Sequence, residues 1–299
     1  MDEREIQVIG FIGLGTMGRL MVASLQRAGF HLVVYDVVAS ATELAIKNGA
    51  QAASSVKEVG ELSDVVVLML PNTPDVESVI YGDDSLMAAP PSRRLIIDMS
   101  TISPGAARQI GTDLLQCGID FVDAPVSGGP IGAEKACLTI MAGGSEDAFS
   151  HALPVLRGMG TTITHVGANG AGQTLKLCNQ LICGVNIQAI SEAIALGRAS
   201  GVDLTIMREV LMGGSASSWM LEKLGLAMIN GDTSAGFRID LMLKDLRLVQ
   251  EMAFDLAVPL PATSLVTTQY LDARSHGEGA NGNQALFTVY DRMSNQTQT

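Results

Sequence analysis

The sequence is short of positive charge and of long uncharged apolar runs. Its 299 residues contain 19 Lys and Arg against 31 Asp and Glu, which gives a formal net charge of −12. Such a surface repels phosphate backbones and anionic lipid headgroups. No uncharged apolar run approaches the roughly 18 residues that a membrane span requires. We therefore expect neither a nucleic-acid partner nor a membrane partner.

Cysteine is also scarce, and its spacing excludes the usual cysteine chemistry. The four residues, Cys117, Cys137, Cys178 and Cys183, form no Cys-x-x-Cys pair and no spacing typical of a metal site. We expect buried thiols in a reducing compartment and no bound metal. The amino terminus, MDEREIQ, is acidic and resembles neither a signal peptide nor a transit peptide. A cytoplasmic location is the expectation.

What the sequence does contain is apolar residues, 47% of the total, and a glycine-rich motif near its start. A strand-length apolar run at 6–12 leads directly into a Gly-x-Gly-x-x-Gly motif, and a helical pattern follows until Gly29. In this context the glycines allow a tight turn, close approach of the backbone to a pyrophosphate, and close packing of helix on strand. The predicted dinucleotide-binding loop consists of Gly13, Leu14, Gly15, Thr16, Met17 and Gly18.

Asp36 indicates which dinucleotide binds. It ends the next predicted strand, 31–35, and lies 23 residues after Gly13, where a ribose hydroxyl would need an acceptor. A carboxylate there repels the 2′-phosphate of NADP, and the residues that follow, Val37 to Ala39, include no arginine to bind one. The sequence therefore predicts NAD.

Alternating strands and helices continue to about residue 166. The continuous apolar run at 65–70 is typical of a strand covered on both faces, and it ends at Leu70 and Pro71. The strand at 95–98 ends just before Thr101; both ends belong to the carboxyl edge of a sheet, where ligands bind. Further strands are predicted at 121–123, 137–142 and 162–166, helices at 39–48, 54–62, 103–116 and 146–157, and a loop at 124–132. This order predicts a doubly wound, largely parallel Rossmann sheet in a dinucleotide-binding domain, residues 1–167.

Beyond this region the strand pattern disappears. Helical segments are predicted at about 173–200, 203–212, 216–229, 240–256, 262–275 and 282–293. We therefore expect an all-α carboxyl-terminal domain, residues 168–299, joined to the first domain by the long helix at its start.

The first turns of that long helix carry an unusual cation. Asn169, Gly170 and Gly172 are expected to break structure, and the helix from 173 is apolar nearly all round, which is typical of a buried helix. Lys176 lies in this apolar segment, with Asn179 and Gln180 three and four positions on, so the three side chains share one face. A buried ammonium needs a partner, a substrate or a depressed pKa. The alternative is a lysine that extends from the first turn to water.

Six motifs in one order give the chain a resemblance to a known family. It resembles the β-hydroxyacid dehydrogenases, the group that contains 3-hydroxyisobutyrate dehydrogenase and tartronate semialdehyde reductase, nearly end to end. The motifs are FIGLGTMG at 11, LMLPN at 68, IIDMSTISP at 96, DAPVSGGPIGA at 123, GAGQTLKLCNQ at 170 and GFRIDLMLKDL at 236.

The resemblance implies a role for each matching residue. Lys176 would be the general acid/base that exchanges the hydroxyl proton while hydride passes between the nicotinamide and the carbinol carbon. Lys244 would reach the site from the second domain, and Thr101 would lie near the nicotinamide ribose. Substrate-binding roles fall on Ser127, Gly128, Gly129, Asn179, Gln180 and Lys244, and cofactor-binding roles on the glycine loop, Asp36, Leu70, Pro71, Thr101 and Lys244. A homodimer or homotetramer is expected.

Within the family, GFRIDL and KLCNQ look more like tartronate semialdehyde reductases, so reduction of tartronate semialdehyde to glycerate, or the reverse, is the expected reaction. The alternative is a dehydrogenase of 3-hydroxyisobutyrate or another 2-(hydroxymethyl) acid. The family usually has Gly-Thr-Leu-Thr after the Ser-Gly-Gly loop, whereas this chain has Ala136-Cys137-Leu138-Thr139.

Other readings remain open at this point. Lys244 could form only an i, i+4 pair with Asp240 on its helix. An imine reductase shares this architecture but usually lacks the lysine. A binding protein that senses the dinucleotide without catalysis would not need Lys176, Ser127 and Asn179 together. A 6-phosphogluconate dehydrogenase needs a longer helical domain.

Overall fold

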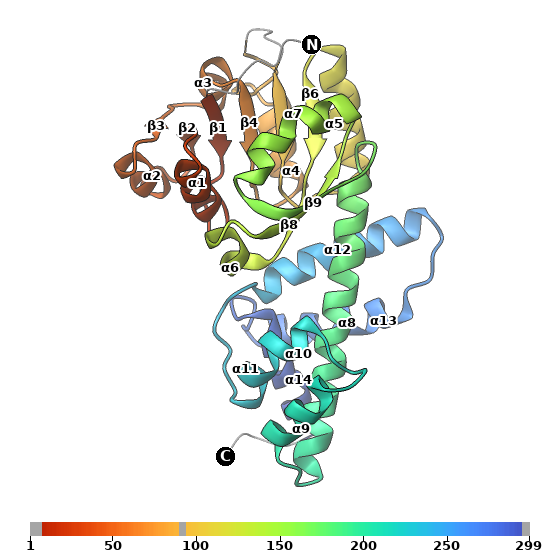
Figure 1. Ribbon diagram of the computed structural model, residues 1–299. Helices are drawn as coiled ribbons and strands as arrows, with labels where there is room; N and C mark the ends of the chain where they lie inside the picture. Colours follow the sequence, from red (N-terminus) through yellow and green to blue (C-terminus); the bar gives the residue numbers. More distant parts are fainter. Residues whose placement is uncertain (1–7, 90–93, 295–299) are drawn as a thin grey trace. The chain divides into compact units, whose positions relative to one another are not determined.

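The computed structural model describes residues 8–89 and 94–294 and divides the chain into two compact units, Met1–Lys176 and Leu177–Thr299. The first unit contains a nine-stranded sheet with the order β3-β2-β1-β4-β5-β6-β8-β7, with β9 paired to β8 (Figure 1). All pairs are parallel except β6–β8 and β7–β8. The strands are β1 (Val8–Ile12), β2 (His31–Tyr35), β3 (Gln51–Ala52), β4 (Val65–Leu68), β5 (Leu95–Asp98), β6 (Asp120–Asp123), β7 (Val126–Ser127), β8 (Leu138–Gly143) and β9 (Gly160–Gly167).

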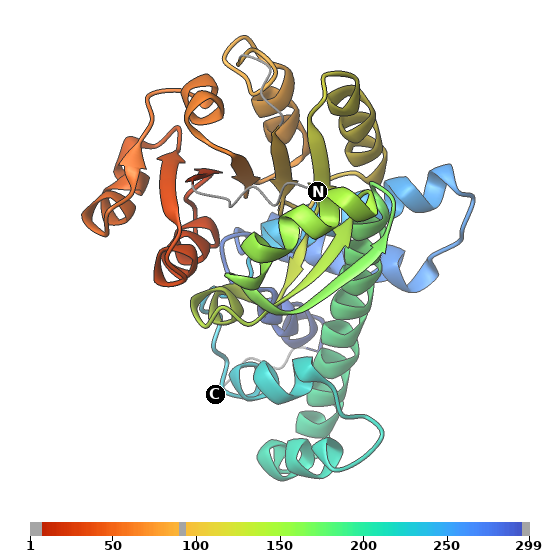
Figure 2. The same ribbon diagram turned by 45° about the horizontal axis from the view of Figure 1, so that its top comes forward.

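Helices cover both faces of this sheet (Figure 2). One apolar core contains side chains of α1 and α7, and the other contains side chains of α3, α4 and α5. The helical elements of this unit are α1 (Gly18–Arg27), η1 (Ala39–Thr42), α2 (Glu43–Lys47), α3 (Val56–Leu62), α4 (Thr73–Tyr81), α5 (Pro104–Gln116), α6 (Gly129–Glu134) and α7 (Glu146–Arg157).

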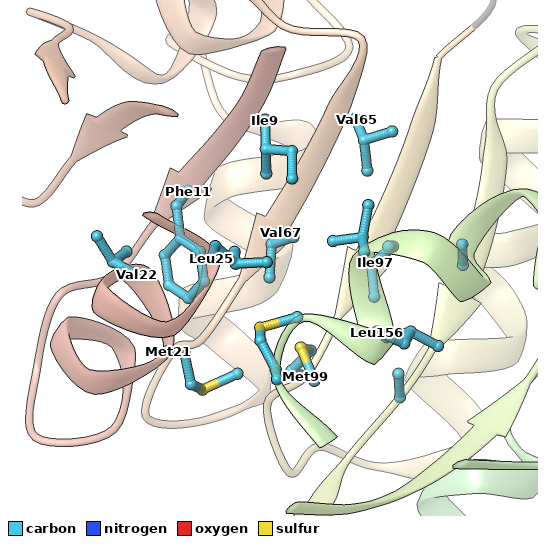
Figure 3. Packing of buried hydrophobic residues seen from close by; sticks show 14 of the residues in the cluster. Ile9, Phe11, Met21, Val22, Leu25, Val65, Val67, Ile97, Met99 and Leu156 are labelled. Carbon is cyan, nitrogen blue, oxygen red and sulfur yellow. The ribbon is translucent and has the colours of Figure 1, made fainter. Parts of the chain in front are cut away.

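The apolar strands of the sheet supply both cores. In β4, Val65 and Val67 belong to the core with α1 and α7, whereas Val66 and Leu68 belong to the opposite core. In Figure 3, Val65 and Val67 lie on the same face of the sheet, with Val67 beside Leu25 of α1. Side chains that alternate between two buried faces explain why these strands are apolar without interruption. The doubly wound sheet predicted from the sequence is confirmed.

The second unit is helical, as predicted. Its helices are the greater part of α8 (Ala171–Ala199), in which the division between the units falls, and α9 (Leu204–Met212), α10 (Trp219–Lys223), α11 (Gly225–Ile229), α12 (Ile239–Asp255), α13 (Pro261–Ser275), η2 (Asn283–Leu286) and α14 (Phe287–Met293). Its core contains Ile187 and Ile194 of α8, Leu246 of α12, Tyr270 of α13 and Phe287.

Several short elements were not predicted. The two-residue strands β3 and β7 are too short to show a period, and α6 begins Gly-Pro-Ile-Gly within the segment predicted as a loop. Helix α4 was also missed, although Asn72 caps it and Pro74 lies in its first turn, both of which are start signals.

Two expectations about α8 were wrong. Gly172 lies inside the helix and does not end it; a side chain there would overlap the carbonyl oxygen of Met141, so glycine serves close packing. The helix is also not buried all round, because Leu175, Ile182 and Leu196 on one stripe are more than 40% exposed. By length and composition α8 could cross a membrane, but core helices pass the same test, and 44% of that apolar window is buried.

The cysteines were expected to be buried, and this was wrong as well. Cys117, Cys137 and Cys178 are exposed and Cys183 is half-buried, all as free thiols. Cys117 is the C-cap of α5, and Cys137 follows the end of α6. Chain segments that leave a helix at the surface face water whatever the residue type.

Candidate active site

The loop between β1 and α1 has the geometry of a phosphate cradle. Gly13 has a φ of +96°, and a side chain there would overlap the carbonyl oxygen of Met69. A side chain at Gly18 would overlap the carbonyl oxygen of Gly13, so Gly18 permits close packing of α1 on the loop. At Gly15, in contrast, an added Cβ would meet no atom within 4 Å. Packing within the protein does not require Gly15 to be glycine, whereas close approach of a pyrophosphate does.

The start of α1 is suited to an anion. Gly15 and Thr16 are exposed, the N-cap residue Met17 provides no side-chain cap, and no acidic residue occupies the first turn. The first amides of a helix and the positive end of its dipole favour a phosphate at this position. These residues fit a dinucleotide pyrophosphate.

Asp36 lies beside this loop at the end of β2. Its Oδ2 accepts a hydrogen bond from the Leu14 amide (2.6 Å), and its Oδ1 accepts one from the Val38 amide (2.8 Å). Each carboxylate oxygen retains a further acceptor site. The half-buried carboxylate therefore fits a role as hydrogen-bond acceptor for a ribose hydroxyl.

The loops that follow β4 and β5 are joined to each other. The Leu70 amide donates to Ser100 Oγ (2.8 Å), and the Ser100 amide donates to Asp98 Oδ1 (3.0 Å). Leu70 and Thr101 are half-buried, and Pro71 is exposed. The structure thus brings the segments of Leu70 and Thr101 together at the carboxyl edge of neighbouring parallel strands.

The Ser-Gly-Gly segment, predicted as a loop, is a strand followed by a short helix. Ser127 ends β7, where it is paired with Thr139 of β8, and Gly129 begins α6. Gly128 and Gly129 have φ values of +128° and +61°, a region that side chains disfavour. The glycines therefore produce a sharp turn directly after the Ser127 hydroxyl, and backbone amides at such a turn can bind an anion.

Helix α6 is fixed to helix α1 by side-chain hydrogen bonds. Ser24 Oγ donates to the Ala133 carbonyl (2.8 Å), and Arg27 Nη2 donates to the Glu134 carbonyl (2.6 Å) and to Ser24 Oγ (2.8 Å). These hydrogen bonds hold the segment that follows Ser127 against α1. The pyrophosphate would lie at the start of the same helix.

Lys176 lies near the start of α8 and is only 7% exposed. The beginning of this helix is held by Asp123, which accepts hydrogen bonds from the amides of Gly170 (2.7 Å) and Gln173 (3.0 Å). Burial raises the pKa of Asp123 to about 7, although these two amides and the Asn169 side chain oppose the rise. Asp123 begins the DAPVSGG motif, so one motif contributes both the helix cap and Ser127.

In the second unit, four polar residues of α8 and α12 form a connected chain. Lys244 Nζ lies 2.8 Å from Asp245 Oδ1, and Gln180 Nε2 donates to Asp245 Oδ2 (2.6 Å). Asn179 Nδ2 donates to Gln180 Oε1 (2.8 Å). The structure therefore brings Asn179, Gln180 and Lys244 together around a carboxylate that is 1% exposed. The Gln180 amide therefore links Asn179 to Asp245.

The simpler reading of Lys244, an i, i+4 pair with Asp240, is wrong. The carboxylate of Asp240 lies 3.4 Å from Arg274 Nε, and Lys244 forms its ion pair with Asp245. The long lysine side chain folds back to its sequence neighbour because that carboxylate is buried and needs a cation.

Sequence reasoning missed Asp123, Gln173 and Asp245. A signal existed for two of them: Asp123 is an acid at the end of an apolar strand, and Asp245 interrupts the apolar face of Met242, Leu246 and Val249. No local pattern distinguishes Gln173. Within the described residues, no group of three or more His, Cys, Asp or Glu side chains could hold a metal ion.

A glycine loop opening a Rossmann sheet, an acid at the end of the second strand and a helical second unit define the class of nicotinamide-dependent oxidoreductases. Comparison with known families agrees. A model for the NAD binding domain of 6-phosphogluconate dehydrogenase matches residues 8–167, and a model described as NAD-binding of NADP-dependent 3-hydroxyisobutyrate dehydrogenase matches residues 170–290.

Individual relatives cover the same length. The chain is 40% identical to the 2-hydroxy-3-oxopropionate reductase of Escherichia coli over 96% of this chain and 98% of the relative. It is 37% identical to the 2-(hydroxymethyl)glutarate dehydrogenase of Eubacterium barkeri over 96% of this chain and 95% of the relative. The solved structure of Mycobacterium tuberculosis 3-hydroxyisobutyrate dehydrogenase with L-serine has a TM-score of 0.87 and 32% identity, covering 95% of this chain and 99% of that one. The chain belongs to the β-hydroxyacid dehydrogenase family and is an NAD-dependent hydroxyacid dehydrogenase.

Proposed function

We propose that the enzyme interconverts tartronate semialdehyde and glycerate with Lys176 as the general acid/base. The observation that carries the catalytic part is Lys176 itself, an ammonium that is 7% exposed in the second turn of a helix whose start is fixed to the ends of the sheet strands. The substrate follows from the GFRIDL and KLCNQ motifs and from the 40% identity to a 2-hydroxy-3-oxopropionate reductase, which is another name for tartronate semialdehyde reductase.

The proposed residues divide the work as follows. The bound nicotinamide supplies or takes the hydride at the carbinol carbon. Lys176 donates a proton to the carbonyl oxygen during reduction, and its amine accepts that proton during oxidation. The Ser127 hydroxyl and the amides of Gly128 and Gly129 donate hydrogen bonds to the substrate carboxylate. Asn179 or Gln180 helps to hold the substrate, and Lys244 offsets its negative charge. Asp245, which pairs with Lys244 and accepts from Gln180, orients these side chains.

We propose that the glycine loop from Gly13 to Gly18, together with Asp36, Leu70, Pro71, Thr101 and Lys244, forms the cofactor site. We propose that NAD is preferred over NADP. The Asp36 carboxylate would repel a 2′-phosphate, and Val37 and Val38 beside it are exposed aliphatic side chains that offer no positive charge.

The second candidate is a dehydrogenase of 3-hydroxyisobutyrate or another 2-(hydroxymethyl) acid, which is what two of the relatives above are named for. In both candidate reactions the substrate carries a carboxylate and a proton is transferred. The substrates differ in the group on C2. A screen of short semialdehydes and hydroxy acids, followed by NADH absorbance, separates them. Faster turnover of tartronate semialdehyde than of methylmalonate semialdehyde supports the proposal, and the reverse order supports the alternative.

The same screen tests the Ser127 segment. Glyceraldehyde keeps the aldehyde and the neighbouring hydroxyl of tartronate semialdehyde but lacks the carboxylate. We expect it to be turned over hardly at all, because the turn amides would lose their anion. Comparable kcat/KM for the two compounds would contradict carboxylate binding at this segment.

We further propose that residues 1–167 form the dinucleotide-binding domain and residues 168–299 a domain for substrate binding and dimerisation, in a cytoplasmic homodimer or homotetramer. The exposed stripe of Leu175, Ile182 and Leu196 on α8 supports self-association, because apolar surface of this kind is usually covered. The four free thiols fit a reducing compartment. Light scattering after size-exclusion chromatography measures the oligomeric state directly. A monomer at micromolar concentration would contradict the proposed homo-oligomer.

A further inference from the structure

The side chain of Gln173, on the first turn of α8, is completely buried and forms two hydrogen bonds to one loop. Its Oε1 accepts from the Ile102 amide (3.0 Å), and its Nε2 donates to the Ser100 carbonyl (2.8 Å). The two bonds lie on either side of Thr101 in the sequence. A planar amide is needed here, because the loop presents one donor and one acceptor at the same time.

The backbone of the same turn is held independently. The amides of Gly170 and Gln173 donate to the carboxylate of Asp123, which satisfies two donors that a helix start leaves without intrahelical partners. Gly172 has no side chain because a Cβ would overlap the Met141 carbonyl oxygen. The first turn of α8 therefore packs directly against β6 and β8. The Gln173 side chain connects this turn to the loop after β5.

This connection reaches further along the carboxyl edge. Ser100, whose carbonyl binds Gln173, accepts a hydrogen bond from the Leu70 amide through its hydroxyl. Gln173 thus joins α8 to the segments of Thr101 and Leu70, both assigned to the cofactor site above. Lys176 follows Gln173 by three residues, on the same side of the helix and about 4.5 Å along its axis.

We propose that Gln173 is a positioning residue for proton transfer: it fixes the turn that carries Lys176 to the loop that carries Thr101. The inference rests on the proposed role of Lys176. A helix is stiff over one turn, so a shift of its anchored turn moves the ammonium by a similar amount. Misplacement of a catalytic group by about 1 Å can cost on the order of a hundredfold in rate.

The test compares Gln173→Met with Gln188→Met. The control residue is also a glutamine of α8, it is 8% exposed, and its Nε2 donates to Glu192 within the helix. We expect Gln173→Met to lower kcat by about 10- to 100-fold while the dissociation constant of NADH changes less than about threefold. We expect Gln188→Met to keep kcat within about twofold.

Two further readouts separate positioning from a loss of folded protein. With NADH deuterated at the transferred position, the isotope effect on kcat should rise in Gln173→Met, because a slower chemical step becomes rate-limiting. Amide exchange at 170–176 should be faster than in the wild-type protein, measured without cofactor. A lower kcat with the wild-type isotope effect and wild-type exchange would overturn the proposal. If Gln173→Met does not fold, Gln173→Glu is judged by the same criteria; it keeps the shape and loses the donor to Ser100.

A double variant separates this inference from the proposed role of Lys176. If Lys176→Ala is severely impaired, Lys176→Ala with Gln173→Met should be no slower than Lys176→Ala alone, because there is no longer an ammonium to position. Multiplied losses would overturn the positioning role and leave the catalytic role of Lys176 intact. Full activity of Lys176→Ala would remove the catalytic role, and the positioning role with it.

Discussion

Ala136, one of the positions where this chain departs from the family pattern, should be a source of strain that glycine relieves. The residue has a φ of +51°, in the left-handed region. It follows the C-cap of α6, and the Cys137 amide donates to the Gly132 carbonyl (2.9 Å) while the Ala136 amide reaches the Ala133 carbonyl (3.3 Å). This is the helix-ending motif that normally has glycine at the left-handed position.

The same motif with glycine ends other helices of this protein. At the end of α5 the Ile119 amide donates to the Leu114 carbonyl around Gly118, and at the end of α13 the Glu278 amide donates to the Ala273 carbonyl around Gly277. The left-handed conformation costs an alanine about 1–2 kcal/mol, and glycine gives back about 0.4–1 kcal/mol through the unfolded chain. We therefore expect Ala136→Gly to raise the free energy of unfolding by about 1 kcal/mol.

For a domain of this size, about 1 kcal/mol corresponds to roughly 2–4 °C in Tm. Calorimetry and urea unfolding measure the change. Ala257→Gly should behave alike, since Ala257 has a φ of +54° after α12. Ala23→Gly, inside α1, is the matched control and should lower stability by about 0.5–1 kcal/mol, because helical alanine is unstrained. Destabilisation by Ala136→Gly equal to that by Ala23→Gly would refute the reasoning.

Three further predictions concern carboxylates of the site. We expect the wild-type enzyme to prefer NADH over NADPH by about tenfold or more in kcat/KM, or about 1.4 kcal/mol, and Asp36→Ala to narrow this preference. Steady-state kinetics with both cofactors measures the preference, and equal efficiencies in the wild-type enzyme would contradict it. Asp245→Asn should lower kcat/KM about tenfold, because it removes the ion pair that holds Lys244. The control Asp240→Asn, on the same helix, should have little effect on kcat/KM. Similar losses in the two variants would show that the Lys244–Asp245 ion pair is unimportant for activity. Because burial raises the pKa of Asp123 to about 7, the folded protein keeps this proton after the unfolded chain has lost it. The free energy of unfolding of the wild-type protein, measured in urea, should therefore fall relative to that of Asp123→Asn as pH rises from about 4 to 7. Parallel plots of this free energy against pH for the two proteins would contradict the raised pKa of Asp123.

The sheet and the longer helices could be predicted because their patterns are local. In β4 every residue is apolar, in β1 every residue except Gly10, and in β5 every residue except the final Asp98. The glycines after α1 and α2, Gly29 and Gly49, have positive φ and end those helices. The two-residue strands β3 and β7 have no period to detect, and they form only because a neighbouring strand offers a ladder.

The candidate site divides in the same way. The glycine loop is a contiguous motif, so its residues could be named from the sequence. The partners of Gln173 lie 71 and 73 residues away, and Gln180 and Asp245 lie 65 residues apart. Such buried polar pairs depend on how the chain folds back on itself, and no local spacing records them. The exposed stripe of α8 was missed because the sequence of a helix that is apolar nearly all round does not show which of its faces the rest of the chain covers.

The most direct test of the account is kcat of Lys176→Ala, measured with tartronate semialdehyde together with NADH binding by fluorescence. We predict a loss of about 10² to 10⁴ in kcat, the range of general acid–base catalysis, with little change in NADH affinity. Lys176→Arg should not restore activity, because a guanidinium is a far weaker acid than an ammonium and has a different shape. Retention of more than about a tenth of the wild-type kcat by Lys176→Ala would show that the proton comes from another group.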